Sequence, residues 1–367
     1  MRITKLDGLR GVFSLMVVMY HYPAEYIPEV IKTSFIVEKS DLFVDFFFVL
    51  SGFVITYNYH NHINTGRELW IFMKKRFIRL YPLLLYTTLI CFSVFLGSKL
   101  FFPQYVKNPG GFGPIINDTI NTLLFMNSTP VFSDRFGMNY PSWSISAEMI
   151  AYLFFGIVTL IAAKQRKGFF LGASIVLGMA FLSFKALGGM QGNYNFVRGI
   201  ISFNIGYFVW AFSQKDRKFS DAWEIVLFVL FLGSLFVANA LKEEVPNAIY
   251  EAIAIPLSFG TFIYVLVHTH GVISKLMDTK PFQFLGKISY SVYLNHSIIL
   301  LLIPKAMFAL LKLPENPVIE TGVAALIIGG VVAYSNITYE IIEKRGGDIL
   351  KGLMLQRRGT SAKVPAA

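Results

Sequence analysis

The chain has 367 residues, of which 54% are hydrophobic and only 15% are charged, and its mean hydropathy is +0.56. Soluble domains carry about 25% charged residues, so this charge deficit excludes a water-soluble globular protein. The formal net charge of +11 does not indicate nucleic acid, because the basic residues form short clusters between apolar segments. The single cysteine, Cys91, excludes a disulfide framework.

The apolar segments predict an all-α fold, a polytopic transmembrane helix bundle with about ten membrane-spanning helices, because each span needs about 17–25 mostly apolar residues. The predicted spans are 9–27, 42–60, 79–102, 142–163, 168–186, 196–213, 223–241, 248–267, 288–311 and 318–342. The first of these mimics a signal peptide, but no small-residue cleavage site follows it, so we expect an uncleaved helix. The stretch 103–141 is expected to be a long loop.

The positions of the basic residues predict that the N and C termini are both cytoplasmic. With ten spans, the inner segments hold about 23 of the 33 Lys and Arg residues, as the positive-inside rule requires. The expected organisation is a transmembrane domain over residues 1–345 and a basic cytoplasmic tail over residues 346–367.

Ionisable residues within the spans indicate a functional path, because they are costly in lipid. His21 follows Arg10 by eleven residues, which puts it roughly 16 Å deeper in the membrane. Asp45 and Glu148 are expected in the same outer half, on two other helices. A histidine beside a carboxylate suits general-base work. The alternative is that these groups form hydrogen bonds that hold the helices together.

A second cluster is expected at the cytoplasmic face. Arg76 and Arg79 lie on one side of a helix entrance, and their forked donors suit phosphates. The alternative is that they set the topology and bind anionic lipids. Pro82 is expected in the first turn of the third span. Two His-x-His pairs are only a weak signal for metal, and no metal site is predicted.

Five segments resemble motifs of the acyltransferase-3 family and occur in the order typical of that family. They are residues 6–11 with His21 downstream, 44–53, 76–82, 143–148 and 285–296. The resemblance implies a multi-pass O-acyltransferase of the bacterial inner membrane. Such proteins move an acyl group, usually acetyl, from cytoplasmic acetyl-CoA to a hydroxyl of a surface polysaccharide, oligosaccharide or glycolipid. The implied partners are acyl-CoA, this carbohydrate and the lipid bilayer.

The resemblance also implies roles for individual residues. The implied catalytic residues are His21, Asp45 and Glu148, although Met149 stands where many relatives have a second acidic residue. The implied donor-binding residues are Arg10, Arg76, Arg79 and Tyr81. The implied acceptor-binding residues are Trp143, Ser144, Ser146, Asn295 and His296.

In this interpretation, CoA docks its phosphates near Arg76 and Arg79. His21, oriented by Asp45, deprotonates the sugar hydroxyl or is itself transiently acylated. Many relatives carry a C-terminal extracytoplasmic hydrolase-like domain, whereas about 25 residues follow the last span here. Any second acyl-handling step is therefore expected in another protein. A transporter or flippase for a lipid-linked sugar or acyl donor is the main alternative, and it predicts an inverted repeat that the sequence does not show.

Overall fold

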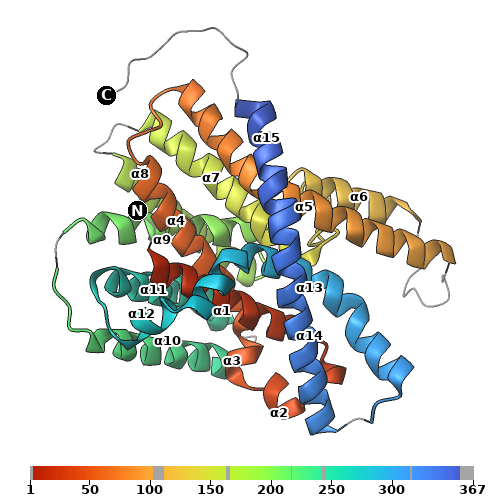
Figure 1. Cartoon of the computed structure of the whole chain (residues 1–367). Coiled ribbons are helices and arrows are strands. Elements are labelled where there is room, and N and C mark those ends of the chain that lie inside the picture. The colour runs from red at the N-terminus through yellow and green to blue at the C-terminus, as the bar shows by residue number, and fades with distance from the viewer. Residues whose placement is uncertain are drawn as a thin grey trace.

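The computed structural model describes residues 3–101, 111–162, 166–215, 217–241, 245–314 and 316–355, and this part of the chain is helical, without a β-strand. The long helices, drawn in Figure 1, are α1 (Thr4–His21), α4 (Phe43–Tyr59), α5 (Gly66–Phe101), α7 (Trp143–Ile161), α8 (Lys167–Ala186), α9 (Asn195–Ser213), α10 (Ala222–Leu241), α11 (Val245–His268), α13 (Lys280–Leu311) and α14 (Pro317–Thr338). The short helices are α2 (Glu29–Lys32), α3 (Phe35–Glu38), α6 (Gly113–Leu123), α12 (Val272–Met277) and α15 (Arg345–Leu355).

Nine helices in the described part of the chain are long and apolar enough to cross a membrane, and they correspond to nine of the predicted spans. The remaining predicted span, 9–27, is shifted in the structure. Helix α1 runs instead from Thr4 to His21, and Lys5, Asp7 and Arg10 give its first half a charged character. It ends at His21 because Pro23 cannot continue a helix.

Helix α5 corrects the prediction for Pro82. It begins at Gly66 and contains Pro82 in its interior, not in its first turn. The start is set by a capping box, in which Glu68 Oε2 accepts from the backbone N–H of Thr65 at 3.0 Å while Thr65 Oγ1 accepts from that of Glu68 at 3.2 Å. The basic segment before the span therefore continues the same helix.

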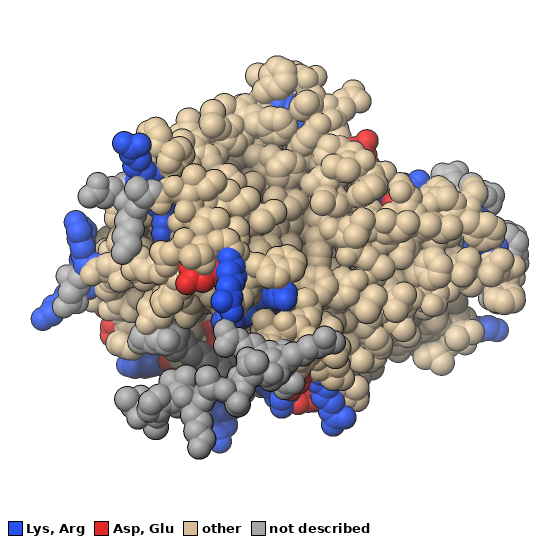
Figure 2. Space-filling model, turned by 90° about the horizontal axis from the view of Figure 1, so that it is seen from above, with Lys and Arg blue, Asp and Glu red and all other residues tan. Residues whose placement is uncertain are grey.

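The C-terminal part forms one continuous column in Figure 1, where α14 passes through a π-helical turn at Tyr339–Lys344 into α15. Residues 346–355 of the predicted tail are thus helical, and residues 356–367 lie outside the described residues. Figure 2 looks onto the face from which α15 projects, and more basic than acidic side chains are visible on it.

Two helix crossings bring backbones into close contact at glycines. A Cβ atom on Gly52 of α4 would lie 1.9 Å from the carbonyl oxygen of Phe203 on α9, and one on Gly11 of α1 would lie 2.6 Å from the backbone nitrogen of Gly286 on α13. Small residues permit such crossings in membrane bundles. Gly11, Gly52 and Gly286, which lie in the motif segments, therefore have a packing role.

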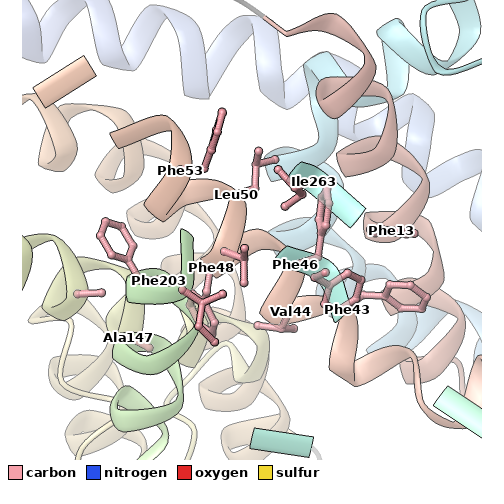
Figure 3. Close-up of a cluster of buried hydrophobic side chains, with 14 of the residues drawn as sticks. Phe13, Phe43, Val44, Phe46, Phe48, Leu50, Phe53, Ala147, Phe203 and Ile263 are labelled. Atoms are coloured by element: carbon pink, nitrogen blue, oxygen red, sulfur yellow. The ribbon is translucent and has the colours of Figure 1, made fainter. Parts of the chain in front are cut away.

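A buried aromatic cluster joins α1 to α4. The ring centroid of Phe13 lies 4.4 Å from that of Phe43 and 4.7 Å from that of Phe46, and Figure 3 shows Phe46 close to Ile263 of α11. Edge and tilted aromatic contacts of this kind stabilise a core. The cluster fixes the direction of α1 and hence the position of His21 at its end.

Candidate active site

A cavity of about 380 Å³ opens between α1, α4, α5, α7 and α13. This volume lies in the range of small-molecule sites, about 300–1,000 Å³. The three predicted donor-binding arginines, Arg10, Arg76 and Arg79, all line it, together with Ser144 and Glu148. Helices far apart in the sequence thus bring five of the predicted site residues to the same cavity.

Arg76 is held among aromatic rings. Its guanidinium carbon lies 5.4 Å from the ring centroid of Tyr59, 5.8 Å from that of Phe72 and 5.9 Å from that of Tyr152. Its buried Nε has no hydrogen-bond partner, and no carboxylate within the described residues forms an ion pair with it. Its Nη2 donates a long hydrogen bond to Tyr59 OH, at 3.4 Å. These contacts orient a guanidinium whose Nε is left for an anion.

Arg79 differs from Arg76, because it is paired with an acid that the sequence analysis missed. Its Nη1 donates to Glu343, whose carboxylate also accepts from Ser291 Oγ at 2.7 Å. The Glu343 side chain is only 2% exposed, whereas that of Arg79 is 45% exposed. Glu343 lies in the π-helical turn, a feature common at functional sites. The expected span ended at residue 342, so this glutamate fell just beyond it and was not considered as a site residue.

Two further polar residues of the cavity, Glu148 and Ser144, each form a small hydrogen-bond network. Glu148 Oε1 accepts from Ser51 Oγ at 2.7 Å and from Tyr152 OH at 2.5 Å. Tyr152 lies one helical turn after Glu148, so helical spacing could have identified this contact. Ser144 Oγ lies 2.8 Å from Tyr293 OH. Glu148 thus belongs to the arginine-lined cavity, which His21 does not line.

His21 and His296 contact each other outside the cavity, next to Tyr293, which lines it. Their Nδ1 and Nε2 atoms are 3.2 Å apart and their ring centroids 5.1 Å apart. His21 Nδ1 also lies 3.0 Å from the carbonyl oxygen of Val17. His296 is fully buried, one turn of α13 after Tyr293, and the two ring centroids are 6.0 Å apart. The histidine pair therefore sits directly behind one wall of the cavity.

The end of α1 is secured by Lys32. Its Nζ donates to the carbonyl oxygens of Tyr20 at 2.5 Å and Tyr22 at 2.9 Å. A positive charge at a helix C-terminus is favourable because of the helix dipole. The ammonium therefore stabilises the helix end that carries His21.

Asp45 does not contact His21, which corrects the expected orienting role. Its carboxylate accepts from Arg198 Nε at 3.1 and 3.0 Å, from Arg198 Nη2 at 2.5 Å, and from Ser202 Oγ at 2.8 Å. The charge of a guanidinium is best compensated by a bidentate carboxylate in a buried site. The available signal in the sequence was Arg198, a basic residue within the predicted span 196–213.

Four other predicted binding residues lie outside the cavity lining. Tyr81 stacks on Phe77 with centroids 4.3 Å apart, and Trp143 packs against Phe48 at 6.2 Å. Ser146 is buried and donates to a backbone carbonyl at 2.5 Å. Asn295 is buried and donates to a threonine hydroxyl of α14 at 2.6 Å. These contacts position helices and loops around the site.

The stretch expected to be a loop, 103–141, has a structural role at the histidines. Its first described part contains α6, and its end is attached to α13 through Asn139. Asn139 Nδ2 donates to the Leu294 carbonyl at 3.1 Å, and its Oδ1 accepts from Ser297 Oγ at 2.6 Å. This attachment brings the Tyr140 ring to 4.7 Å from the His21 ring. No sequence signal distinguished Tyr140.

The groups near the cavity do not assemble a metal site. Among the residues that the structure describes, no group of three or more His, Cys, Asp or Glu side chains could hold a metal ion. The site as described consists of guanidinium, hydroxyl, carboxylate and imidazole groups, which can bind an anion and transfer a proton.

Residues 3–335 match the acyltransferase-3 family, described as an acyltransferase domain. The chain is 25% identical over 320 residues to the peptidoglycan O-acetyltransferase OatA of Listeria monocytogenes, covering 80% of this chain and 49% of that protein. It is 24% identical over 310 residues to the O-acetyltransferase OatA of Staphylococcus aureus, covering 79% of this chain and 49% of that protein. The chain thus spans about half the length of these relatives, and no solved structure matches it. Because the family match covers nearly the whole chain, this protein belongs to the acyltransferase-3 family.

Proposed function

We propose that the protein is an integral membrane O-acyltransferase that moves an acyl group, most simply acetyl, from cytoplasmic acyl-CoA to a hydroxyl of a cell-surface or exported carbohydrate. The observation that carries this proposal is the arginine-lined cavity, with Arg76 free of any acidic partner in the described residues, next to the His21–His296 pair. The Listeria relative is named for peptidoglycan, so peptidoglycan fragments are the first acceptors to test.

Arg10 and Arg76 are proposed to bind the phosphates of CoA. The buried, unpartnered Nε of Arg76 fits an anion at this end of the cavity. Among the described residues, the acidic partner of Arg10 is Asp7, at a loose distance of 3.6 Å, so the charge of Arg10 is also available. When bound, acyl-CoA supplies the acyl group as an activated thioester. Because the positive-inside rule places basic helix ends in the cytoplasm, this end of the cavity is proposed to be the donor entrance.

His21 is proposed to act as the general base. The Val17 carbonyl can only accept, so Nδ1 carries the proton of the neutral ring and Nε2 keeps a lone pair. Nε2 removes the proton of the acceptor hydroxyl as its oxygen bonds to the acyl carbon. The thioester C–S bond breaks, and the proton passes from His21 to the departing sulfur. Transient acylation of His21 is the alternative route.

Reconstitution tests the proposal. Vesicles containing the protein receive labelled acetyl-CoA and envelope glycans, and label in the glycan is measured for the wild type, for His21→Ala and for a control, His62→Ala, whose residue is exposed. We expect transfer by the wild type and the control, and a loss of about 10²–10⁴-fold in His21→Ala.

The other outcomes separate the parts of the proposal. Undiminished transfer by His21→Ala would refute the role of His21 and leave the enzyme class in place. Movement of a lipid-linked sugar across the vesicle membrane without acyl transfer would instead establish the transporter or flippase alternative.

A further inference from the structure

We propose that His296 is a positioning residue for His21, which fixes the tautomer of His21 and stabilises the imidazolium that forms during proton transfer. From the sequence, His296 was expected to bind the acceptor. The inference rests on the proposed acyl transfer with His21 as the base, and it assigns to a second histidine the role that Asp45 was expected to fill.

The geometry of the two rings requires opposite hydrogen-bonding states at the nitrogens that face each other. His296 Nε2 and His21 Nδ1 are 3.2 Å apart, and the rings are stacked with an interplanar angle of 27°. At this distance one nitrogen must carry a hydrogen and the other a lone pair. Two N–H groups facing each other would repel, so the two rings cannot both be charged.

The neighbouring carbonyl decides which nitrogen carries the hydrogen. Val17 O lies 3.0 Å from the same Nδ1 of His21 and can only accept. Nδ1 is therefore the donor, and its hydrogen is shared between Val17 O and His296 Nε2. His296 is then neutral with its lone pair directed at His21. This contact leaves His21 Nε2 as the basic nitrogen.

Other described groups do not provide this orientation. Asp45 is occupied by Arg198 and Ser202, and no carboxylate contacts His21 in the described part of the chain. His296 is held in place because it is fully buried on α13 and its ring packs against those of Tyr293 and Tyr140, with centroids 6.0 Å away in each case. When His21 gains a proton, the lone pair of His296 and the Val17 carbonyl are the acceptors that stabilise the new charge.

Two substitutions separate the acceptor function of His296 from its packing. In His296→Gln, the side-chain carbonyl can accept from His21 Nδ1, whereas His296→Leu fills similar space without an acceptor. We expect kcat for acetyl transfer to fall about 100-fold or more in the leucine variant, by analogy with the loss of an orienting group. The KM for acetyl-CoA should stay within about twofold of the wild type, and glutamine should restore most of the activity.

A second readout does not depend on acyl transfer. Diethyl pyrocarbonate modifies unprotonated histidine nitrogens, and the rate of carbethoxylation at His21 is followed by peptide mass spectrometry in intact protein. We expect slower modification at His21 in the leucine variant and near wild-type modification in the glutamine variant. The melting temperature in detergent shows that each variant is folded.

Three results would overturn the inference. Equal loss of kcat in both variants would show that packing alone matters. An increase of KM with unchanged kcat would assign His296 to substrate binding. Identical carbethoxylation rates in all three proteins would show that His296 does not act on His21. If the wild type transfers no acyl group, the proposed function fails, while the modification rates still decide whether the pair exists.

Discussion

Replacing Arg76 with methionine should weaken donor binding and leave the fold intact. Arg76 has no carboxylate partner among the described residues, so its removal leaves no buried acid unpaired. The change removes a 3.4 Å hydrogen bond to Tyr59 OH and cation–π contacts with Tyr59, Phe72 and Tyr152. Methionine can still pack against these rings. The change therefore removes the guanidinium and keeps most of the local packing.

The size of the effect follows from the hydrogen bonds of a charged group. Such bonds contribute about 1.5–3 kcal/mol each, and every 1.4 kcal/mol is tenfold in affinity. One lost guanidinium–phosphate contact should therefore raise the KM for acetyl-CoA about 10- to 150-fold with little change in kcat. Arg76→Lys should give an intermediate value, because lysine keeps the charge and loses the fork.

The assay is acetyl transfer in proteoliposomes at a saturating acceptor concentration, with acetyl-CoA varied. Arg67→Met is the matched control, because Arg67 lies on the same helix but is exposed and does not line the cavity. An unchanged KM in Arg76→Met, or the same increase in Arg67→Met, would refute the assignment of Arg76 to the donor site.

Three further predictions concern stability. Arg79→Met should lower the melting temperature in detergent, because it leaves the buried carboxylate of Glu343 without its basic partner. The double variant Arg79→Met, Glu343→Gln should regain the lost melting temperature. A double variant that stays as unstable as Arg79→Met would count against the Arg79–Glu343 ion pair. Gly52→Ala should destabilise the bundle strongly, because the added Cβ atom would lie 1.9 Å from a carbonyl oxygen. The control Gly233→Ala should leave the stability unchanged, because no atom lies within 4 Å of its added Cβ. Equal melting temperatures of the two variants would contradict this prediction. Asp45→Asn should reduce the yield of folded protein measured by size-exclusion chromatography, because the guanidinium of Arg198 loses its bidentate carboxylate. A normal yield together with a loss of acyl transfer would instead indicate that Asp45 takes part in the chemistry.

Much of the fold could be predicted from the sequence, because the signals are local. The long apolar segments predict the helices, since only structures that satisfy their own backbone hydrogen bonds cross a membrane. Nine predicted spans match helices of sufficient length and hydropathy. The eleven-residue spacing between Arg10 and His21 places them at different depths on α1 whatever the neighbours of that helix are. Helix starts were less well predicted, because the capping box at Thr65 lies in a polar segment before the span.

The tertiary structure alone decided which residues meet. A span that is apolar on all sides does not show which face is directed inwards, so depth could be inferred and neighbours could not. The pairing of Asp45 with Arg198, of His21 with His296 and of Arg79 with Glu343 depends on the rotation of each helix about its axis. That rotation is set by close crossings at glycines and by the aromatic cluster, where different helices come into contact. The sequence by itself therefore determined the chemical groups and their positions along the helices, and packing determined their partners.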